Sequence, residues 1–319
     1  MENHRFQIRH ECIGGCLALN DGEAHGLTTR LGDNMKDFQG KTAFITGAAH
    51  GIGLGMAITF AKAGMNVTMS DIRKESLVVA REEVRKHTEA VYTIPVDVSD
   101  RIAMKEAADE AEKAFGKIHI LCNNAGINIF GPIDQATYDD WDWMINVNLY
   151  GVINGLMSFL PKIKAHGEGG HIVNTASMAA FVSSHVTGVY SATKHAVRGL
   201  TETLWYNLAP QNIGVSMLCP GFVSSNIHYT EELRPEEFKN SGYEVDPKMQ
   251  ERLARAQAIG MSPIEVGERV LKGIERNDLF IFTHAELKDE VADNFEEILA
   301  AFADEEINKK RVRRTAKNG

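Results

Sequence analysis

The sequence predicts a single α/β domain built on a doubly wound parallel sheet of about seven strands. Short apolar runs alternate with helical patterns from residue 40 onward, which is typical of a parallel sheet covered on both faces. A glycine-rich turn follows the first of these runs. The length of 319 residues and the apolar content of 44% allow one large domain or two modest ones.

The first three strands and their helices follow from short motifs. The β-branched run TAFIT (42–46) is the first strand, and the segment 51–64 has helical spacing with a terminal glycine. The second strand is NVTMSD (66–71), followed by a helix over 75–87. The third strand is AVYTIPVD (90–97), followed by a charged helix over 101–115.

The remaining strands repeat the pattern. A fourth strand over 118–126 ends in a polar turn and precedes a long helix over 138–165. GHIVNTAS (170–177) is the fifth strand, with a helix over 188–209, and IGVSMLCPG (213–221) is the sixth. A helix over 263–277, a last strand over 278–283 and an amphipathic helix over 285–302 complete the domain.

One segment breaks the alternation. Residues 224–260 are polar, charged and rich in turn signals, with a helix predicted over 247–258. Because open α/β sheets bind ligands at the carboxyl ends of their strands, we predict that this insertion is a helical lid over the substrate. Its apolar residues are expected to face a second apolar set across the substrate. The lid set is Ile227, Tyr229, Leu233, Phe238, Tyr243 and Met249, and the facing set is Ile127, Phe130, Met178 and Phe181.

The two ends of the chain lack the alternating pattern. Residues 1–34 are predicted to be a loose extension, residues 35–303 the domain, and residues 304–319 a charged tail. Cys12 and Cys16 match no established zinc spacing, so no metal is expected. The basic run KKRVRRTAK near the end is more typical of a solvated terminus than of a nucleic-acid site.

Composition excludes several classes of protein. With 34 basic and 43 acidic residues the net charge is −9, which argues against wholesale nucleic-acid binding. No run approaches the ~18 apolar residues of a membrane span. Four scattered cysteines favour a reducing compartment, so the cytoplasm is expected.

The turn TGAAHGIG between the first strand and helix has the composition of a diphosphate-binding loop. Glycines let the backbone approach a pyrophosphate, and the helix N-terminus attracts its charge. A tight turn without a ligand would look the same. Asp71 ends the second strand, where a carboxylate accepts the ribose hydroxyls of NAD and repels the extra phosphate of NADP. Asp71 could also cap the following helix, and both roles could hold together.

Tyr190 and Lys194 stand four residues apart in a predicted helix, so they share one face. A neighbouring ammonium favours the phenolate and lowers the pKa of a tyrosine, which is normally about 10. The pair could therefore act as a general acid–base centre, or it could be an ordinary pair on a surface helix.

Together these motifs resemble the short-chain dehydrogenase/reductase family of NAD(P)-binding Rossmann proteins. The matching motifs occur in the family's order over residues 40 to about 225: TGAAHGIG, Asp97 in DVSD, NNAG at 123–126, Asn148 in NVNLYG, Ser177, YSATK at 190–194 and PGFVSS at 220–225.

The resemblance implies a catalytic set of Asn148, Ser177, Tyr190 and Lys194. Tyr190 would exchange a proton with the substrate oxygen, which Ser177 would hydrogen-bond. Lys194 would lower the pKa of Tyr190 and hold the nicotinamide ribose. Asn148 would help hold a water that links Lys194 to solvent.

The resemblance also implies a set of cofactor contacts. The expected cofactor-binding residues are Gly47, His50, Gly51, Ile52, Gly53, Asp71, Arg73, Asp97, Val98, Asn124, Ala125, Gly126, Tyr190, Lys194, Pro220, Gly221, Val223 and Ser225, with Asn123 also near the adenosine ribose. Ser225 replaces the family's usual threonine but keeps a hydroxyl. His50 and Arg73 could favour NADP, whereas Asp71 should meet the ribose directly, so NAD is the expected cofactor.

A narrower resemblance concerns the substrate. The segments GGHIVNTASMAA, SSNIHYTEELRPEEF and LFIFTH are similar to a bacterial branch that includes Cα-dehydrogenases of lignin-type aryl ethers. This implies an NAD-dependent enzyme that interconverts a bulky aromatic or alicyclic secondary alcohol and its ketone. An NADPH-dependent β-ketoacyl reductase is a second possibility, and a cofactor-binding regulatory or scaffold protein a third.

Self-association is expected as well. The segment WDWMINVNLYGVINGLMSFL (141–160) is apolar nearly all round, which argues for burial on both sides. Family members commonly pair this helix and the helix over 188–209, so a homotetramer or homodimer is expected. Coverage by the chain's own termini is the less favoured alternative.

Overall fold

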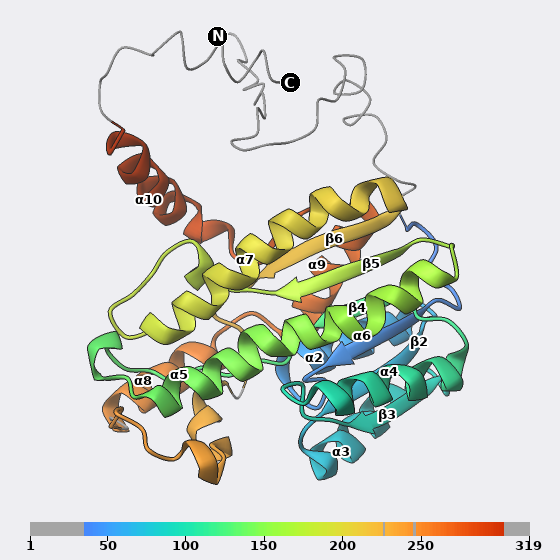
Figure 1. Cartoon of the computed structure of the whole chain (residues 1–319), viewed down its shortest axis with the longest axis horizontal. Helices are drawn as coiled ribbons and strands as arrows, with labels where there is room; N and C mark the ends of the chain where they lie inside the picture. The colour runs from blue at the N-terminus through green and yellow to red at the C-terminus, as the bar shows by residue number, and fades with distance from the viewer. Residues whose placement is uncertain (1–34, 226, 245–246, 303–319) are drawn as a thin grey trace, which may run out of the picture.

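Seven parallel strands form the centre of the molecule (Figure 1). The computed structural model describes residues 35–225, 227–244 and 247–302, with backbone only for 228, 229, 249, 250 and 257. The strand order is β3-β2-β1-β4-β5-β6-β7. The strands are β1 (Thr42–Thr46), β2 (Asn66–Asp71), β3 (Val91–Pro95), β4 (Ile120–Asn123), β5 (Gly170–Thr175), β6 (Ile213–Cys219) and β7 (Phe280–Phe282). The doubly wound sheet predicted from the sequence is therefore confirmed.

Helices cover both faces of the sheet because alternate strand residues point to opposite sides. Phe44 of β1 packs on one face with α4 (Arg101–Phe115), α6 (Gly151–Ala165) and α7 (Gly188–Leu208). Ile45 packs on the other face with α2 (Gly51–Lys62), α3 (Lys74–Arg85) and α9 (Pro263–Arg276). The order in which the strands are added to the sheet reverses between β1 and β4. In open α/β sheets, ligands bind at the carboxyl ends of the strands at such a point.

The long helix predicted over 138–165 is present but is not uniform. It begins as α5 (Tyr138–Ile145), passes through a π-helical turn at Asn146–Tyr150 and continues as α6. Single π turns in helices frequently mark functional sites, and this one contains Asn148.

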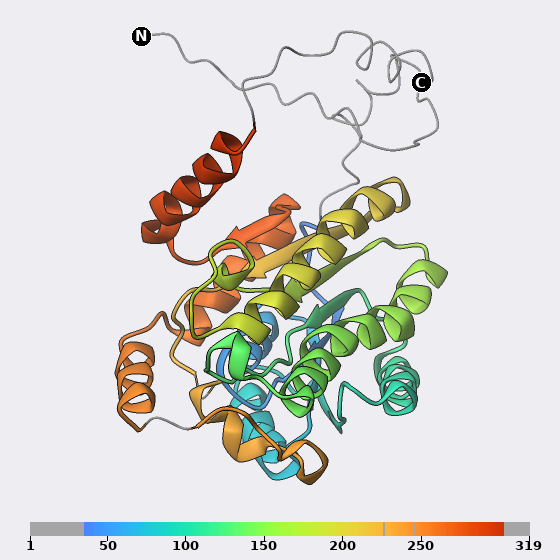
Figure 2. The ribbon, with the colours of Figure 1, turned by 60° about the vertical axis from the view of Figure 1, so that its left-hand side comes forward.

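The insertion after β6 contains three helical pieces. Two 3-10 turns, Ile227–Leu233 and Glu236–Phe238, precede α8 (Pro247–Ala258), which has the bounds that the sequence predicted. The turn at Glu236–Phe238 contacts α5, and the turn at Ile227–Leu233 contacts α8, which stands at the edge of the molecule (Figure 2). The chain then returns through α9 to β7.

The last helix, α10 (Lys288–Ala300), follows a short 3-10 turn at Ala285–Leu287 and projects from the body of the molecule (Figure 2). The predicted extension over 1–34, with Cys12 and Cys16, and the predicted tail over 304–319 lie outside the described residues. The domain boundaries there stay predictions. Among the described residues, no helix is long and apolar enough to cross a membrane.

Candidate active site

The predicted site residues gather at the carboxyl ends of the strands. The glycine turn follows β1, Asn124 follows β4, Ser177 follows β5, and Pro220 follows β6. A backbone hydrogen bond of 3.0 Å from Met178 to the Pro220 carbonyl joins the last two turns. Parallel strands bring these four turns to one edge, so segments far apart in sequence, such as Gly47 and Pro220, lie at the same edge of the sheet.

The glycine turn has backbone that other residues rarely adopt. Gly47 and Gly51 have φ of +64° and +51°, in the left-handed region. A Cβ on Gly53 would lie 2.1 Å from the Gly47 carbonyl oxygen. The turn therefore needs glycine at these positions and presents bare backbone at the N-terminus of α2, beside Ile52. These features fit the diphosphate of a dinucleotide.

Three residues with charged or titratable side chains surround the place expected for the adenosine ribose. Asp71 is 4% exposed and accepts hydrogen bonds from the Ala49 amide (3.2 Å) and from the backbone and guanidinium of Arg73 (3.0 to 3.3 Å). Arg73, not Asp71, is the N-cap residue of α3, so the capping alternative for Asp71 is wrong. His50 Nδ1 is buried without a partner among the described residues. Burial, aided by Arg73, lowers the pKa of His50, so its imidazole is neutral at pH 7.

Asn123 at the end of β4 and Asn124 after it bond different parts of the molecule. Asn124 donates to the Thr46 carbonyl (3.0 Å) and lies against Gly47, whose Cβ would meet Ala125 Cα at 2.9 Å. Asn123 instead donates to Asn174 (2.9 Å) in the sheet. The structure thus places Asn124 and Ala125 beside the glycine turn and gives Asn123 a structural role.

Asp97 and Val98 lie beyond β3, where the adenine is expected. Asp97 accepts from the amide and hydroxyl of Ser99, at 2.9 and 2.7 Å, which closes a local turn. Val98 is 7% exposed, and Asn154 of α6 donates to its carbonyl at 2.8 Å. The hydrogen bond from α6 therefore holds this turn in place, and Asp97 is half-buried within it.

The loop after β6 closes the cofactor side of the site. Gly221 donates to Thr283 Oγ1 (3.2 Å), and Val223 forms a parallel bridge with Met261. A Cβ on Gly51 would lie 3.0 Å from Ser225 Cβ. Ser225 therefore lies directly against the glycine turn, as expected if one ligand spans both.

Tyr190, Lys194 and Ser177 form one cluster. Tyr190 and Lys194 lie on α7 and are 8% and 3% exposed, with the Lys194 ammonium 5.4 Å from the centre of the tyrosine ring. Ser177 caps a 3-10 turn, where its hydroxyl accepts from the Ala179 amide (3.1 Å), and it also hydrogen-bonds the Tyr190 phenol. Lys194 donates to the Thr175 carbonyl at 2.9 Å.

Burial dominates the electrostatics of this cluster. It raises the pKa of Tyr190 to about 12, although the Ser177 hydrogen bond opposes the shift. It lowers the pKa of Lys194 to about 8. Desolvation thus moves both groups toward their neutral forms. The phenol of Tyr190 is therefore protonated at neutral pH and can donate a proton, and the effect of Lys194 that we predicted from the sequence is smaller than the effect of burial.

Asn148 lies at the π turn and is fully buried. Its amide accepts from the Ile127 N–H (2.8 Å) and donates to the Ile127 carbonyl (2.9 Å) and to Thr193 Oγ1 (3.1 Å). A Cβ on Gly126 would meet both Asn148 Oδ1 (3.2 Å) and Lys194 Nζ (3.5 Å). The side chain therefore holds the loop after β4 against α7, and its predicted role toward a water stays a prediction.

Thr46 is a site residue that the sequence reasoning did not single out. Its hydroxyl accepts from the amides of Asn124 and Ala125, both at 2.9 Å, and so joins the β4 loop to the glycine turn. The available signal was its position directly before Gly47 in TGAAHGIG.

The predicted apolar walls are present only in part. Ile127, Phe238 and Tyr243 pack in one cluster with Trp143 and Tyr190. Phe181 packs instead with Phe280 and Phe282 beside β7, at ring-centre distances of 6.1 and 5.2 Å, so its predicted place in the wall is wrong. The side chains of Tyr229 and Met249 lie outside the described residues.

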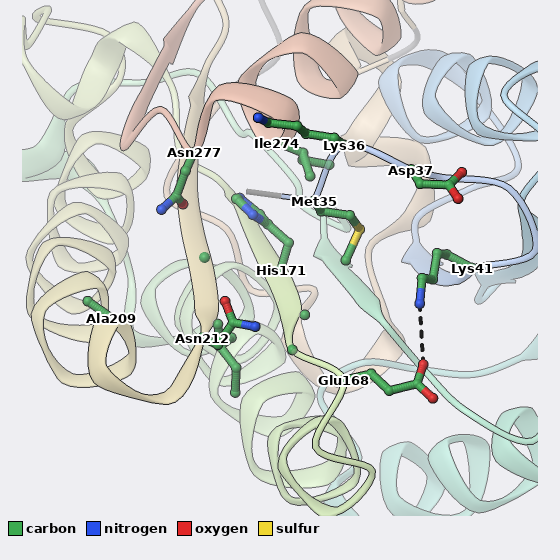
Figure 3. Close-up of a pocket in the computed structure, with 14 residues that line it drawn as sticks. Met35, Lys36, Asp37, Lys41, Glu168, His171, Ala209, Asn212, Ile274 and Asn277 are labelled. Atoms are coloured by element: carbon green, nitrogen blue, oxygen red, sulfur yellow. Dashed lines mark hydrogen bonds and ion pairs between the residues drawn. The ribbon is translucent and has the colours of Figure 1, made fainter. Parts of the chain in front are cut away.

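A cavity of about 410 Å³ lies at the opposite, amino edge of the sheet (Figure 3). Its lining includes Lys41, Glu168, His171 and Asn277. His171 is buried, which lowers its pKa to about 3, and hydrogen-bonds Ser216 Oγ at 2.8 Å. Since β1, β5 and β6 begin here, this cavity is remote from the catalytic cluster.

Near this cavity His119, His166 and Glu168 offer ligand atoms within 4.8 Å of one another. Their hydrogen bonds argue against a cation. His119 Nδ1 accepts from the Thr42 amide (3.1 Å) and His166 Nδ1 from the Glu168 amide (3.2 Å). Because each Nδ1 accepts a hydrogen bond, the proton of each ring lies on Nε2, so neither imidazole offers a lone pair to a metal.

Comparisons with known proteins agree with this geometry. Residues 41–236 match the model of a family described as short chain dehydrogenase. The chain is 40% identical to a C alpha-dehydrogenase of Sphingobium sp. SYK-6 over 84% of this chain and 88% of that protein. It is 31% identical to a 1-deoxy-11-beta-hydroxypentalenate dehydrogenase of Streptomyces avermitilis over 82% of this chain and 90% of that protein.

A solved structure shows the same fold. The structure of a short chain dehydrogenase/reductase from Burkholderia phymatum in complex with NAD superposes with a TM-score of 0.79 at 34% identity, covering 85% of this chain and 98% of that one. The resemblance to the Cα-dehydrogenase branch, first seen in short segments, is thus confirmed over most of the chain.

Proposed function

This chain belongs to the short-chain dehydrogenase/reductase family, and on that premise we propose that it is an NAD-dependent oxidoreductase for a bulky aromatic or alicyclic secondary alcohol and its ketone. As a member of this family it is an oxidoreductase that acts on hydroxyl groups. One observation carries the finer proposal: the buried side chains of Tyr190 and Lys194 meet Ser177 at the carboxyl ends of the strands, where a Cβ on Gly126 would lie 3.5 Å from Lys194 Nζ.

The chemistry requires a proton and a hydride to move together. Bound NAD would accept or return the hydride. Tyr190 would exchange the proton with the substrate oxygen, and the Ser177 hydroxyl would hold that oxygen beside the phenol. In ketone reduction the protonated phenol, favoured by burial, is already the required acid. In alcohol oxidation the phenolate must form, and the ammonium of Lys194 would stabilise it.

NAD rather than NADP is proposed because Asp71 is buried at the end of β2. A carboxylate at this place accepts ribose hydroxyls and repels a phosphate. Arg73 keeps the NADP alternative open, since its side chain is 32% exposed and could turn from Asp71 toward a phosphate. The alternative of an NADPH-dependent β-ketoacyl reductase requires this movement of the Arg73 side chain.

Two observations support the proposed class of substrate: the apolar side chains around Tyr190 and the names of two similar proteins. Ile127, Trp143, Phe238 and Tyr243 surround Tyr190 with apolar and aromatic surface. A small hydroxy acid would need a cationic anchor there. Arg234, the guanidinium beside Trp143, is already bound to Asp140 and Glu231. The names of the two relatives, a C alpha-dehydrogenase and a hydroxypentalenate dehydrogenase, also point to bulky substrates.

Two measurements test the proposal. NADH and NADPH are titrated separately by fluorescence, and then benzylic alcohols, alicyclic alcohols, short hydroxy acids and β-ketoacyl thioesters are screened by nicotinamide absorbance. We expect tighter NADH binding and turnover of the bulky alcohols. Preference for NADPH with thioesters would favour the reductase alternative, and cofactor binding without turnover would favour the regulatory or scaffold alternative.

Two further proposals concern the setting. We place the enzyme in the cytoplasm, since Cys122 and Cys219 are buried free thiols whose pKa values burial raises. We also propose a homotetramer or homodimer, because apolar side chains of α5, α6 and α7 remain exposed. They are Tyr138, Met157 and Tyr206.

A further inference from the structure

A buried ion pair joins the insertion to α5. Arg234 Nη2 lies 2.9 Å from Asp140 Oδ1, and the two side chains are 6% and 0% exposed. Their positions are 94 residues apart in sequence. Because an unpaired charge at such a site is strongly unfavourable, the pair constrains where the insertion can lie on α5.

Asp140 also receives hydrogen bonds from both sides of this contact. On the α5 side, the Thr137 amide donates at 2.9 Å. On the insertion side, the Ser241 hydroxyl donates at 2.8 Å and the Gly242 amide at 3.0 Å. Although burial opposes ionisation, these bonds and the Arg234 charge lower the pKa of Asp140, so it is ionised at neutral pH.

All three nitrogens of the Arg234 guanidinium bond protein groups. Nη1 donates to the Phe238 carbonyl at 2.9 Å, and Nη2 also meets Glu231 at 3.0 Å and Ser241 at 3.2 Å. Nε bonds the second oxygen of Glu231. The guanidinium lies 4.8 Å from the centre of the Trp143 ring. An arginine bonded in this way holds the protein together rather than anchoring a ligand.

Two glycines fit the same contact. Gly131, in the loop after β4, seats the ring of Tyr243, since a Cβ there would lie 2.1 Å from a ring carbon. A Cβ on Gly242 would lie 1.7 Å from the Gln135 carbonyl oxygen. Residues 231–243, here called the latched segment, therefore pack closely on α5 and on the loop after β4, and they contribute Phe238 and Tyr243 to the cluster around Tyr190.

The rest of the insertion is held less firmly. None of the side chains described in α8 is buried. Its ion pair between Arg255 and Glu251 joins side chains that are 78% and 63% exposed. Few buried contacts imply a low local free energy of opening.

We propose that Asp140 and Arg234 are a positioning pair, which fixes the latched segment as the rigid wall of the substrate site and leaves α8 as the part that opens. This inference rests on the proposed function for its role in substrate binding. It narrows the lid predicted over 224–260 to α8.

The test is amide hydrogen exchange on the full chain with NAD, measured by mass spectrometry on the parent and on Arg234→Met. Methionine keeps much of the apolar stem over Trp143 and removes the charge. In the parent, residues 234–243 should exchange at least tenfold more slowly than α8. In the variant, exchange at 234–243 should rise at least tenfold, with β1, β4 and β5 unchanged and the Kd for NADH within twofold.

The controls separate positioning from general stability. Arg269→Met breaks an exposed pair with Glu265 on α9 and should change neither exchange at 234–243 nor the Kd. Arg234→Lys keeps the positive charge but lacks the several N–H groups of the guanidinium. Relative to Arg234→Met, it should restore part of the protection of residues 234–243 from exchange. Should Arg234→Met fail to fold, Ser241→Ala removes one donor to Asp140 and should raise exchange at 234–243 by a few-fold.

Activity provides the second measurement. With a bulky alcohol that the parent oxidises, Arg234→Met should raise KM at least tenfold and change kcat by less than threefold. The proposal is overturned if exchange at 234–243 does not change, if the whole sheet exchanges faster, or if kcat falls while KM stays constant. Absence of turnover in the parent would refute the proposed function alone, because exchange still tests the pair.

Discussion

Replacing Lys194 by methionine should make the folded chain more stable at neutral pH while it removes activity. Lys194 is 3% exposed, and burial lowers its pKa from 10.5 to about 8. Between these two values the unfolded chain binds a proton that the folded chain does not. The free energy of unfolding of the parent should therefore rise as the pH increases from 8 to 10.5 and stay depressed below pH 8.

The magnitude follows from this pKa difference. A shift from 10.5 to about 8 corresponds to about 3 kcal/mol of lost stability at pH 7 and about 1.5 kcal/mol at pH 9.5. Methionine removes this cost but leaves the Thr175 carbonyl without its donor, which costs about 1 kcal/mol. The net gain should be about 2 kcal/mol at pH 7 and close to zero at pH 9.5.

Urea unfolding of cofactor-free parent and Lys194→Met at pH 7 and pH 9.5 tests this reasoning. Tyr190, with its own raised pKa, is present in both proteins, so its contribution largely cancels in the difference. A variant less stable than the parent at pH 7, or a gain that does not shrink at pH 9.5, would refute the claim that burial of the Lys194 charge costs stability. Retained turnover would refute its catalytic role.

Four further outcomes are expected. Tyr190→Phe should reduce kcat at least 100-fold with the Kd for NADH within twofold, and kcat within a few-fold of the parent would refute the role of the phenol. Asp71→Ala should weaken NAD use and improve NADP use at least tenfold in kcat/KM, and a parent that already prefers NADPH would contradict the reading of this carboxylate. Gly53→Ala should weaken NAD binding at least tenfold, because its Cβ would meet the Gly47 carbonyl, while Gly199→Ala, with nothing within 4 Å of its Cβ, should leave binding unchanged. Light scattering at micromolar concentration should give at least twice the 35.2 kDa of one chain, and a monomer would refute the proposed assembly.

The sequence determined the fold class because local patterns carried the required information. Alternation of strand and helix periodicity predicted the seven-stranded sheet, and the helix over 247–258 had its observed bounds. The order of TGAAHGIG, Ser177 and YSATK identified the family before any contact was known. These signals are short-range, since helical spacing and turn composition depend on neighbours within a few residues.

Tertiary structure decided what each polar side chain bonds. Asp71 could be a helix cap or a ribose acceptor from sequence alone, and the fold placed the cap at Arg73. Asn148 proved to hold the loop at Ile127, and burial rather than the neighbouring Lys194 dominates the pKa of Tyr190. Desolvation depends on every segment packed around a group, so spacing along one helix cannot supply it.

The latched segment shows the same limit over a longer range. Sequence predicted 224–260 as one polar, mobile lid, because charge and turn residues are typical of exposed loops. The fold instead buries Arg234 against Asp140 from α5. A charged residue such as Arg234 is expected at the surface when the sequence is considered alone. It can be buried only when an oppositely charged side chain from a distant segment, here Asp140, packs against it, and the packing of the whole chain determines that contact.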